Sequence, residues 1–195
     1  NFEWIAYAGS QVAYLRTRAD YRDTNAWYHI VISSDTDQGT ASNRTKMYVN
    51  GVQITDFITE NYPNSAAEYK WNDDVVHSVG AFRYGSTTNN FLHAYVAEVI
   101  NIDGQQLDPT SFGEFDSDSG IWKAKKIDGL TFGSQGFYLD FATRVTDPID
   151  ASGNGNNFTS SNVIADDYAL DVPTNNFCTL NPLSVGPRNN GQDSS

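Results

Sequence analysis

The sequence has a single cysteine, Cys178, and only three histidines, which are far apart in the chain: His29, His77 and His93. One thiol cannot form an intrachain disulfide, and a cysteine-based zinc site needs several thiolates. The histidines also lack the short spacings that are typical of metal ligands. We therefore expect neither a disulfide framework nor a zinc centre.

Basic residues are scarce as well. The 195 residues include 12 lysines and arginines against 24 aspartates and glutamates, which gives a formal net charge of −12 at pH 7. Nucleic-acid phosphates and anionic lipid surfaces attract positive charge, so this balance argues against both as partners. No apolar run reaches the roughly 18 residues of a membrane-spanning helix, and no membrane insertion is expected.

Apolar residues with the period of a long helix are absent. Short runs rich in β-branched and aromatic residues recur instead between turn residues, a pattern that is typical of a sandwich or barrel. The expected strands are residues 11–16, 27–33, 45–50, 52–58, 76–84, 93–101 and 136–142. Single helical turns are expected at 65–70 and at 108–115, where Asp108 and Pro109 form an N-cap and first-turn pair.

A sharp turn is predicted at Asn50-Gly51, within the stretch KMYVNGVQI (residues 46–54). Apolar and polar side chains alternate on both sides of this pair. A type I′ turn needs positive φ at both central residues, and asparagine followed by glycine meets that need best. We expect an antiparallel hairpin that sets the register of a sheet and serves as scaffold, with function left to the loops and termini.

The composition changes after about residue 144. Four of the six prolines lie beyond it, and residues 145–195 carry six aspartates against one basic residue, Arg188. Because so few apolar residues cannot build a separate core, we expect a sandwich over 1–144 and an extended, irregular arm over 145–195. The arm would dock on its own domain or on a neighbour through spaced apolar residues: Phe158, Tyr168, Leu170, Val172, Phe177, Leu180 and Leu183.

The chain starts with NFEWIAYAGSQVAYL, which reads as if it were already inside a β-structure. The first residue is asparagine rather than methionine. We therefore expect the sequence to be part of a longer chain.

Two stretches resemble the core of laminin-G-like and concanavalin A-like jelly rolls. Residues 27–54, WYHIVISSDTDQGTASNRTKMYVNGVQI, resemble its Trp-x-His, polar loop and Tyr-Val-Asn-Gly pattern. Residues 91–109, FLHAYVAEVINIDGQQLDP, resemble the strand that carries Ala-Glu before an Asp-Gly turn. The resemblance implies an all-β fold, an antiparallel jelly-roll β-sandwich of the concanavalin A-like lectin/glucanase type.

A third resemblance is to structural proteins of marine tailed bacteriophages. It is carried by DPTSFGEFDSDSGIWKAKKIDG (108–129), by GSQGFYLDF (133–141), and by DASGNGNNFTSSN and DVPTNNFCTLNPL further on. It implies a non-enzymatic virion protein of the capsid decoration, tail or fibre, located in the extracellular particle. Its partners would be other virion proteins and copies of itself. The alternatives are an adhesion module that binds host-surface glycans and, more remotely, a secreted glycanase.

Glycoside hydrolysis needs two carboxylates that flank the sugar bond. The nearest match is Glu114 with Asp116, followed by Asp118. The stretch is expected in a loop, and serine occupies position 119, where the hydrolase pattern has a third acid. We interpret it as a solvated acidic loop and assign no catalytic residue.

Two binding sites are weighed against ordinary structural roles. Aromatic and amide side chains suit sugars, although strand aromatics usually fill cores; the candidates are Trp71, Tyr84, Asn89 and Asn90. No cofactor is required, but loop carboxylates at the rim of a jelly roll suit Ca²⁺. The candidate ligands are Asp35, Asp37, Asp73 and Asp74. The alternative is that these aspartates bind no ion and only keep exposed loops soluble.

Overall fold

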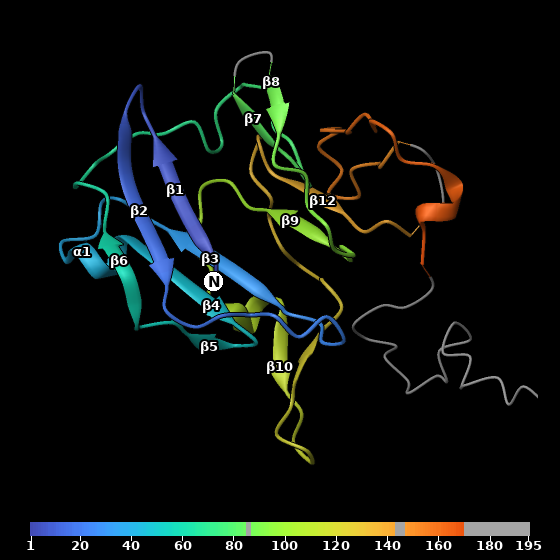
Figure 1. Cartoon of the computed structure of the whole chain (residues 1–195), viewed down its shortest axis with the longest axis horizontal. Coiled ribbons are helices and arrows are strands. Elements are labelled where there is room, and N and C mark those ends of the chain that lie inside the picture. Colours follow the sequence, from blue (N-terminus) through green and yellow to red (C-terminus); the bar gives the residue numbers. More distant parts are fainter. Residues whose placement is uncertain (85–86, 143–146, 170–195) are drawn as a thin grey trace, which may run out of the picture.

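The computed structural model describes residues 1–84, 87–142 and 147–169 (Figure 1). These residues are all-β, as the sequence predicts. Helix in the described ranges is limited to short turns: α1 (Ala41–Arg44) and the 3₁₀ turns η1 (Pro109–Ser111) and η2 (Ala165–Asp167).

The strands form small sheets in which every described pairing is antiparallel. One sheet has the strand order β1 (Glu3–Tyr7), β2 (Gln11–Thr17), β6 (Phe57–Asn61). Another has the order β3 (Ile30–Ser34), β4 (Thr45–Val49), β5 (Val52–Gln53). Three pairs complete the set: β7 (Phe82–Tyr84) with β8 (Thr87–Asn89), β9 (Val99–Asn101) with β12 (Phe137–Leu139), and β10 (Gly113–Phe115) with β11 (Trp122–Ala124).

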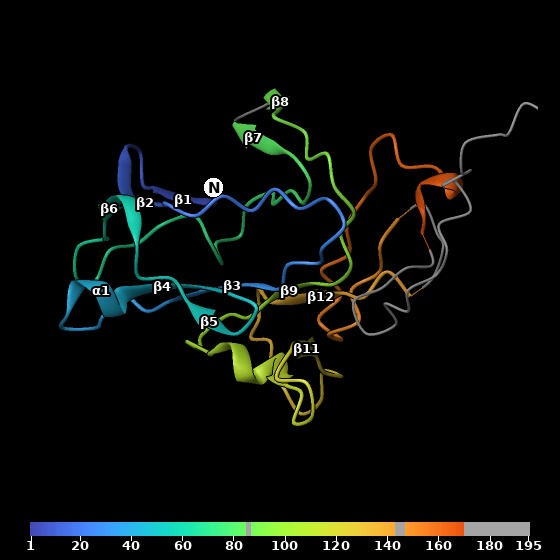
Figure 2. The ribbon, with the colours of Figure 1, turned by 60° about the horizontal axis from the view of Figure 1, so that its bottom comes forward.

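The two three-stranded sheets lie in two layers (Figure 2). Side chains of a strand alternate between the faces of its sheet, so each strand contributes every second residue to the core. The buried residues of β2 and β4 follow this rule: Ala13, Leu15, Thr17, Thr45, Met47 and Val49. Tyr69 bridges the layers, since its ring contacts Trp4 edge-on and its hydroxyl hydrogen-bonds the Ser34 hydroxyl.

The hairpin predicted at Asn50-Gly51 is confirmed. Asn50 has φ 49° and Gly51 has φ 78°, and Val49 pairs with Val52 across the turn. Asn50 also holds the neighbouring strand, because its side-chain Oδ1 accepts from the His29 amide at 2.8 Å and its amide donates to the His29 carbonyl at 2.8 Å. The turn thus joins all three strands of its sheet.

The strand expected over 52–58 divides in two. The Ile54 amide donates to the Met47 carbonyl at 2.8 Å, and the chain then crosses to the other layer, where β6 pairs with β2. A single apolar run therefore supplies strands to both sheets. Residues 54–56 make the crossing that the sequence pattern did not reveal.

Three other expected strands are shorter than predicted because residues with positive φ interrupt them. Glu98 (φ 38°) precedes β9, Phe141 (φ 49°) follows β12, and Gly80 (φ 80°) precedes β7. The helical turn expected at 65–70 is wrong, since Ala66 has φ 54°, outside the right-handed helical region. The turn at 108–115 is confirmed as η1, where Asp108 Oδ1 accepts from the Thr110 amide at 2.8 Å.

The indole of Trp122 joins the β10–β11 hairpin to the β3-β4-β5 sheet. It lies directly over Gly51 and Gly113, so close that a Cβ atom at either glycine would overlap the ring. The Phe115 ring packs edge-on against the indole, with 4.9 Å between the ring centroids. The centroid of the His29 ring lies 5.6 Å from that of Trp122. Two separate constraints therefore require glycine at position 51: the positive φ of the turn and the close approach of the Trp122 ring.

Replacing Gly51 by alanine should lower the free energy of unfolding by more than about 1 kcal/mol, because a left-handed φ and a steric overlap act together. Urea denaturation measures the change. Gly39→Ala is the matched control, since a Cβ at Gly39 meets open space and no positive φ restrains it. Equal stability of the two variants would contradict the contact between Gly51 and Trp122.

The carboxylate of Asp150 organises the described segment after residue 147. Its Oδ1 accepts from the amides of Tyr138 at 2.8 Å and Ser152 at 2.9 Å, and its Oδ2 accepts from the Asn156 amide at 2.9 Å. The Asp150 amide donates to Asn157 Oδ1 at 2.9 Å. The residue is buried, and one carboxylate thus closes the turn and ties it to β12.

Two asparagines of the same segment extend this attachment. Asn154 Nδ2 and Asn156 Nδ2 each donate to the Gly136 carbonyl at 2.9 Å. Asn156 also reaches the Ser134 carbonyl at 3.2 Å, and Asn154 bonds the Gly133 carbonyl. These asparagines satisfy backbone carbonyls that no strand partner covers, so the segment is held by polar contacts.

Burial by itself would raise the pKa of Asp150, but the hydrogen bonds from Tyr138, Ser152 and Asn156 outweigh it and lower the pKa. A lowered carboxyl pKa stabilises the fold above the unfolded pKa of roughly 4, and this contribution is lost as the pH falls through the folded value. Asp150 therefore favours the native state at neutral pH.

Asp150→Asn should reduce the free energy of unfolding at pH 7 by about 1–3 kcal/mol, because a charged acceptor of several amides is lost. The difference from the unsubstituted protein should shrink as the pH falls below 4, because the aspartate takes up a proton first in the unfolded state and, at lower pH, in the folded state. Chemical denaturation at both pH values measures this. The exposed Asp128→Asn is the control; a similar loss there, or a pH-independent difference at 150, would refute the role of the carboxylate.

Candidate functional site

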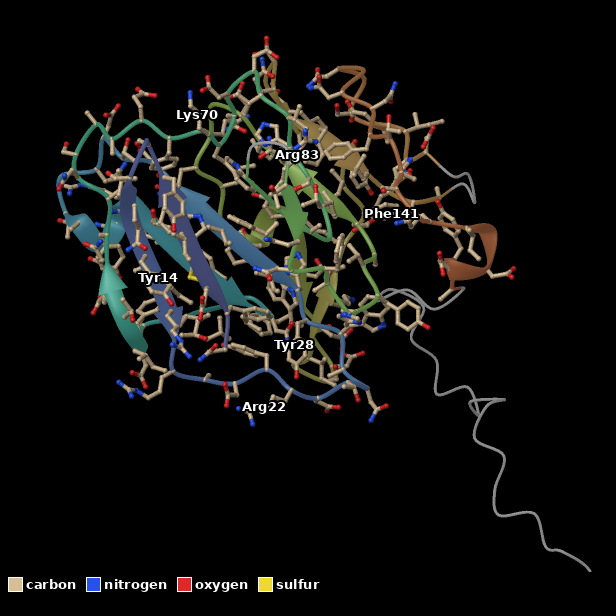
Figure 3. All side chains as sticks on the ribbon, turned by 45° about the horizontal axis from the view of Figure 1, so that its top comes forward. Tyr14, Arg22, Tyr28, Lys70, Arg83 and Phe141 are labelled. Carbon is tan, nitrogen blue, oxygen red and sulfur yellow. The ribbon has the colours of Figure 1, made fainter. Side chains whose placement is uncertain are left out.

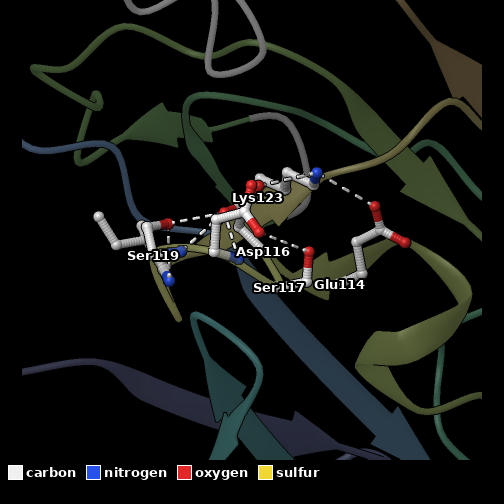
Figure 4. A network of polar contacts seen from close by, with 7 residues as sticks. Glu114, Asp116, Ser117, Ser119 and Lys123 are labelled. Atoms are coloured by element: carbon white, nitrogen blue, oxygen red, sulfur yellow. Dashed lines mark hydrogen bonds and ion pairs between the residues drawn. The ribbon is translucent and has the colours of Figure 1, made fainter.

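The acidic stretch at residues 114–118 lies on the β10–β11 hairpin (Figure 4). Glu114 is in strand β10, opposite Lys123 of β11, so its expected placement in a loop is wrong. Only Asp116 and Asp118 belong to the connecting loop. The partner strand at 122–124 is what makes residues 113–115 a strand, and it is too short to be recognised from its pattern.

Lys123 is paired with both carboxylates, so the three groups together keep one negative charge. Its Nζ lies 3.4 Å from Glu114 Oε1 and 3.1 Å from Asp116 Oδ2. Asp116 Oδ1 also accepts from the Ser119 amide at 2.9 Å, the Ser119 hydroxyl at 3.0 Å and the Asp118 amide at 3.1 Å. The Ser119 amide, and next Lys123, hold the pKa of Asp116 far below its usual range. An acid so strongly ionised stabilises the loop and is a poor proton donor.

Substituting Lys123 by methionine should raise the pKa of Asp116, since a hydrogen-bonded cation is removed. The pKa should stay below the ordinary aspartate value because the contacts with Ser119 and Asp118 remain. Carboxyl carbon shifts followed by NMR across an acid titration measure it. Lys126→Met is the control, and an unchanged Asp116 in the Lys123 variant would contradict the ion pair.

The calcium candidates are held in separate local contacts. Asp35 accepts from the Asp37 amide at 3.0 Å and from the Gln38 side chain, while Asp73 pairs with Lys70 at 2.6 Å. Asp74 is exposed. Within the described ranges, no three histidine, cysteine or acidic side chains are placed to hold a metal ion together.

The sugar candidates occupy two places. Trp71 is 65% exposed and meets the His77 ring edge-on at 6.3 Å, whereas Asn89 and Asn90 lie at the exposed end of β8. In the described part of the chain, no contact joins the tryptophan to these asparagines. The backbone of Tyr84 pairs with Thr87, and its side chain lies outside the described residues.

Two of the predicted arm anchors are described. Phe158 packs edge-on against Phe137 of β12 at 4.8 Å between centroids, and its amide donates to the Pro148 carbonyl at 3.1 Å. Tyr168 is half-buried. The other anchors lie outside the described residues: Leu170, Val172, Phe177, Leu180 and Leu183.

A cavity of about 380 Å³ lies where the described C-terminal segment meets the rest of the molecule. Sequence analysis did not identify it, because its walls come from distant parts of the chain. Figure 3 shows Phe141, one of the lining residues, beside the C-terminal segment. The lining residues are Trp27, Ala94, Tyr95, Val96, Ala97, Glu98, Ala124, Asp140, Phe141, Pro148, Ser160, Val163, Asp167, Tyr168 and Ala169.

Large apolar side chains are exposed along residues 71–96. Two strands were expected to begin in this stretch, at 76 and at 93, yet its described residues form only the short β7–β8 hairpin. Without further strand partners, the side chains remain 38–72% exposed: Trp71, Val75, Val76, Val79, Phe82, Phe91, Leu92, Tyr95 and Val96.

No helix in the described ranges is both long and apolar enough to cross a membrane. Comparison with known proteins found no matching family, no matching curated protein and no matching solved structure.

Proposed function

We propose that this chain is a non-enzymatic structural subunit of a tailed-bacteriophage virion, part of the capsid decoration, tail or fibre. The observation that carries the proposal is the exposed apolar surface of residues 71–96. Soluble monomers seldom leave many large apolar side chains open to water, and such surfaces commonly mark contacts with other proteins. A virion subunit covers such a surface when the particle assembles.

The size of the sheets supports an assembly role. The described strands contain at most seven residues, and no sheet has more than three strands. Two- and three-stranded sheets bury little apolar surface by themselves. Contacts with neighbouring subunits would cover the side chains that such small sheets leave open.

The charge arrangement at residues 114–116 supports the non-enzymatic part of the proposal. A retaining or inverting glycosidase needs one carboxyl that keeps its proton near neutral pH. Asp116 has a lowered pKa, and Lys123 is paired with both Asp116 and Glu114. An Asp116 held ionised in this way does not supply the proton-bearing carboxyl that a glycanase requires.

The finer fold assignment, a concanavalin A-like jelly roll, belongs to the same proposal. It is supported by two antiparallel layers and by the Asn50-Gly51 hairpin within the stretch that resembles such domains. The copies of itself and the other virion proteins expected as partners would contact the exposed 71–96 surface and the arm.

The purified chain should self-associate as its concentration rises, and Val76→Asp should weaken this association about tenfold, because a charge is placed in an apolar contact. Sedimentation velocity measures the effect. Val52→Asp is the matched control: Val52 is 61% exposed and Val76 68%, but Val52 lies in β5, outside the proposed surface. Equal weakening by both variants would contradict the surface assignment.

Mass spectrometry of purified phage particles whose genome encodes the chain should detect it at a constant ratio to the major capsid protein. Detection only in the unassembled fraction of the lysate would overturn the virion proposal. Binding to host-surface polysaccharide by a chain absent from particles would instead favour the adhesion alternative.

A further inference from the structure

The cavity beside the C-terminal segment has the size of a small-molecule site. Its volume of about 380 Å³ falls within the roughly 300–1,000 Å³ of typical ligand pockets. Six separated parts of the chain contribute to its walls: Trp27, residues 94–98, Ala124, residues 140–141, Pro148 and residues between 160 and 169. The cavity shares residues 94–96 with the exposed stretch 71–96, and its other lining residues lie outside that stretch.

Among the described residues, the charged groups that line the cavity are all acidic. Glu98, Asp140 and Asp167 line it, and no lysine, arginine or histidine is among its lining residues. The whole chain carries a net charge of −12, so the surrounding field has the same sign. Glu98 and Asp167 are exposed at the cavity and Asp140 is half-buried, and carboxylates gathered in this way give it a negative potential that attracts cations and repels anions. The ligand that suits this cavity therefore carries positive charge.

Aromatic rings form much of the remaining wall. Trp27, Tyr95, Phe141 and Tyr168 come from four different segments and line the same space. The face of an aromatic ring attracts a cation, and sets of such rings recognise quaternary and other alkylated ammonium groups. Rings beside carboxylates accommodate both the apolar surface and the charge of such an ion.

Two further features distinguish this cavity from a packing gap. The Ser160 hydroxyl oxygen is buried and has no hydrogen-bond partner among the described residues, while Ser160 itself lines the space. Glu98 lies just before β9 and Phe141 lies shortly after its partner strand β12. Both residues adopt positive φ and both line the cavity. Left-handed backbone at residues other than glycine is costly and is concentrated at binding sites.

We infer that this cavity binds a small organic cation of the alkylammonium class. The aromatic rings contact the alkyl groups around the nitrogen, and the carboxylates of Glu98, Asp140 and Asp167 balance the charge. The Ser160 hydroxyl is available to a hydroxyl or other polar group at the far end of the ligand.

Choline and its neutral isostere 3,3-dimethylbutan-1-ol test the inference, because they share shape and hydroxyl and differ in charge. Choline added to the full chain should shift the NMR signals of the cavity residues with saturation, and the neutral alcohol should bind at least about tenfold more weakly. Raised salt should weaken the choline interaction, since part of the attraction is long-range.

Variants identify the residues responsible. Asp167→Asn and Tyr95→Ala should each weaken choline binding about threefold or more, a typical size for one partly exposed cation–aromatic or charge contact. The adjacent Asp166→Asn changes the net charge equally but does not line the cavity, and Tyr7→Ala removes an exposed tyrosine from β1. Both controls should bind choline like the unsubstituted chain.

The inference fails if the neutral alcohol binds as tightly as choline, if neither compound binds at millimolar concentration, or if the controls weaken binding as much as the cavity variants. Saturable binding of neutral oligosaccharides in the cavity with no preference for cations would likewise overturn it. Circular dichroism of each variant establishes that a loss of binding occurs in a folded chain.

Discussion

The hydrogen bonds that converge on Asp150 are the interaction on which the C-terminal part of the described structure depends. This segment has few apolar residues, so burial alone holds it weakly. One buried carboxylate accepts from Tyr138, Ser152 and Asn156, and it thereby joins a turn to the edge of β12. Because charge-assisted hydrogen bonds are about twice as strong as neutral ones, a few of them replace a missing core.

The attachment through Asp150 also builds the cavity. Pro148, Ser160, Asp167 and Tyr168 line the cavity, and the segment between Pro148 and Ser160 lies against β12, where Phe158 packs on Phe137. The opposite wall comes from residues 94–98 and 140–141, which meet at one end of the β9–β12 pair, where Val99 pairs with Leu139. Stability of the segment and formation of the proposed cation site are therefore linked: a variant that loosens Asp150 should also open the cavity.

Acidic side chains serve three different purposes in this chain. Asp150 is buried and binds backbone amides, Asp116 is half-buried and pairs with Lys123 at a hairpin tip, and Asp167 lines the cavity. The excess of acids over bases argues against phosphate-rich partners but does not distinguish these roles. Their surroundings do, because the same carboxylate stabilises a turn where amides face it and attracts a cation where aromatic rings surround it.

The sequence by itself determined the features that depend on neighbouring residues: the all-β class, the turn at Asn50-Gly51, and the Asp108 cap before Pro109. Spacing also identified Phe158 as an anchor, although not its partner Phe137. Only the tertiary structure decided where strands end, since Glu98 and Phe141 interrupt apolar runs with positive φ that no local propensity favours. It alone brought Trp122 onto Gly51 and placed four aromatic rings and three carboxylates around one cavity. Such contacts join residues far apart in the chain, and periodicity describes only residues that are close together in it.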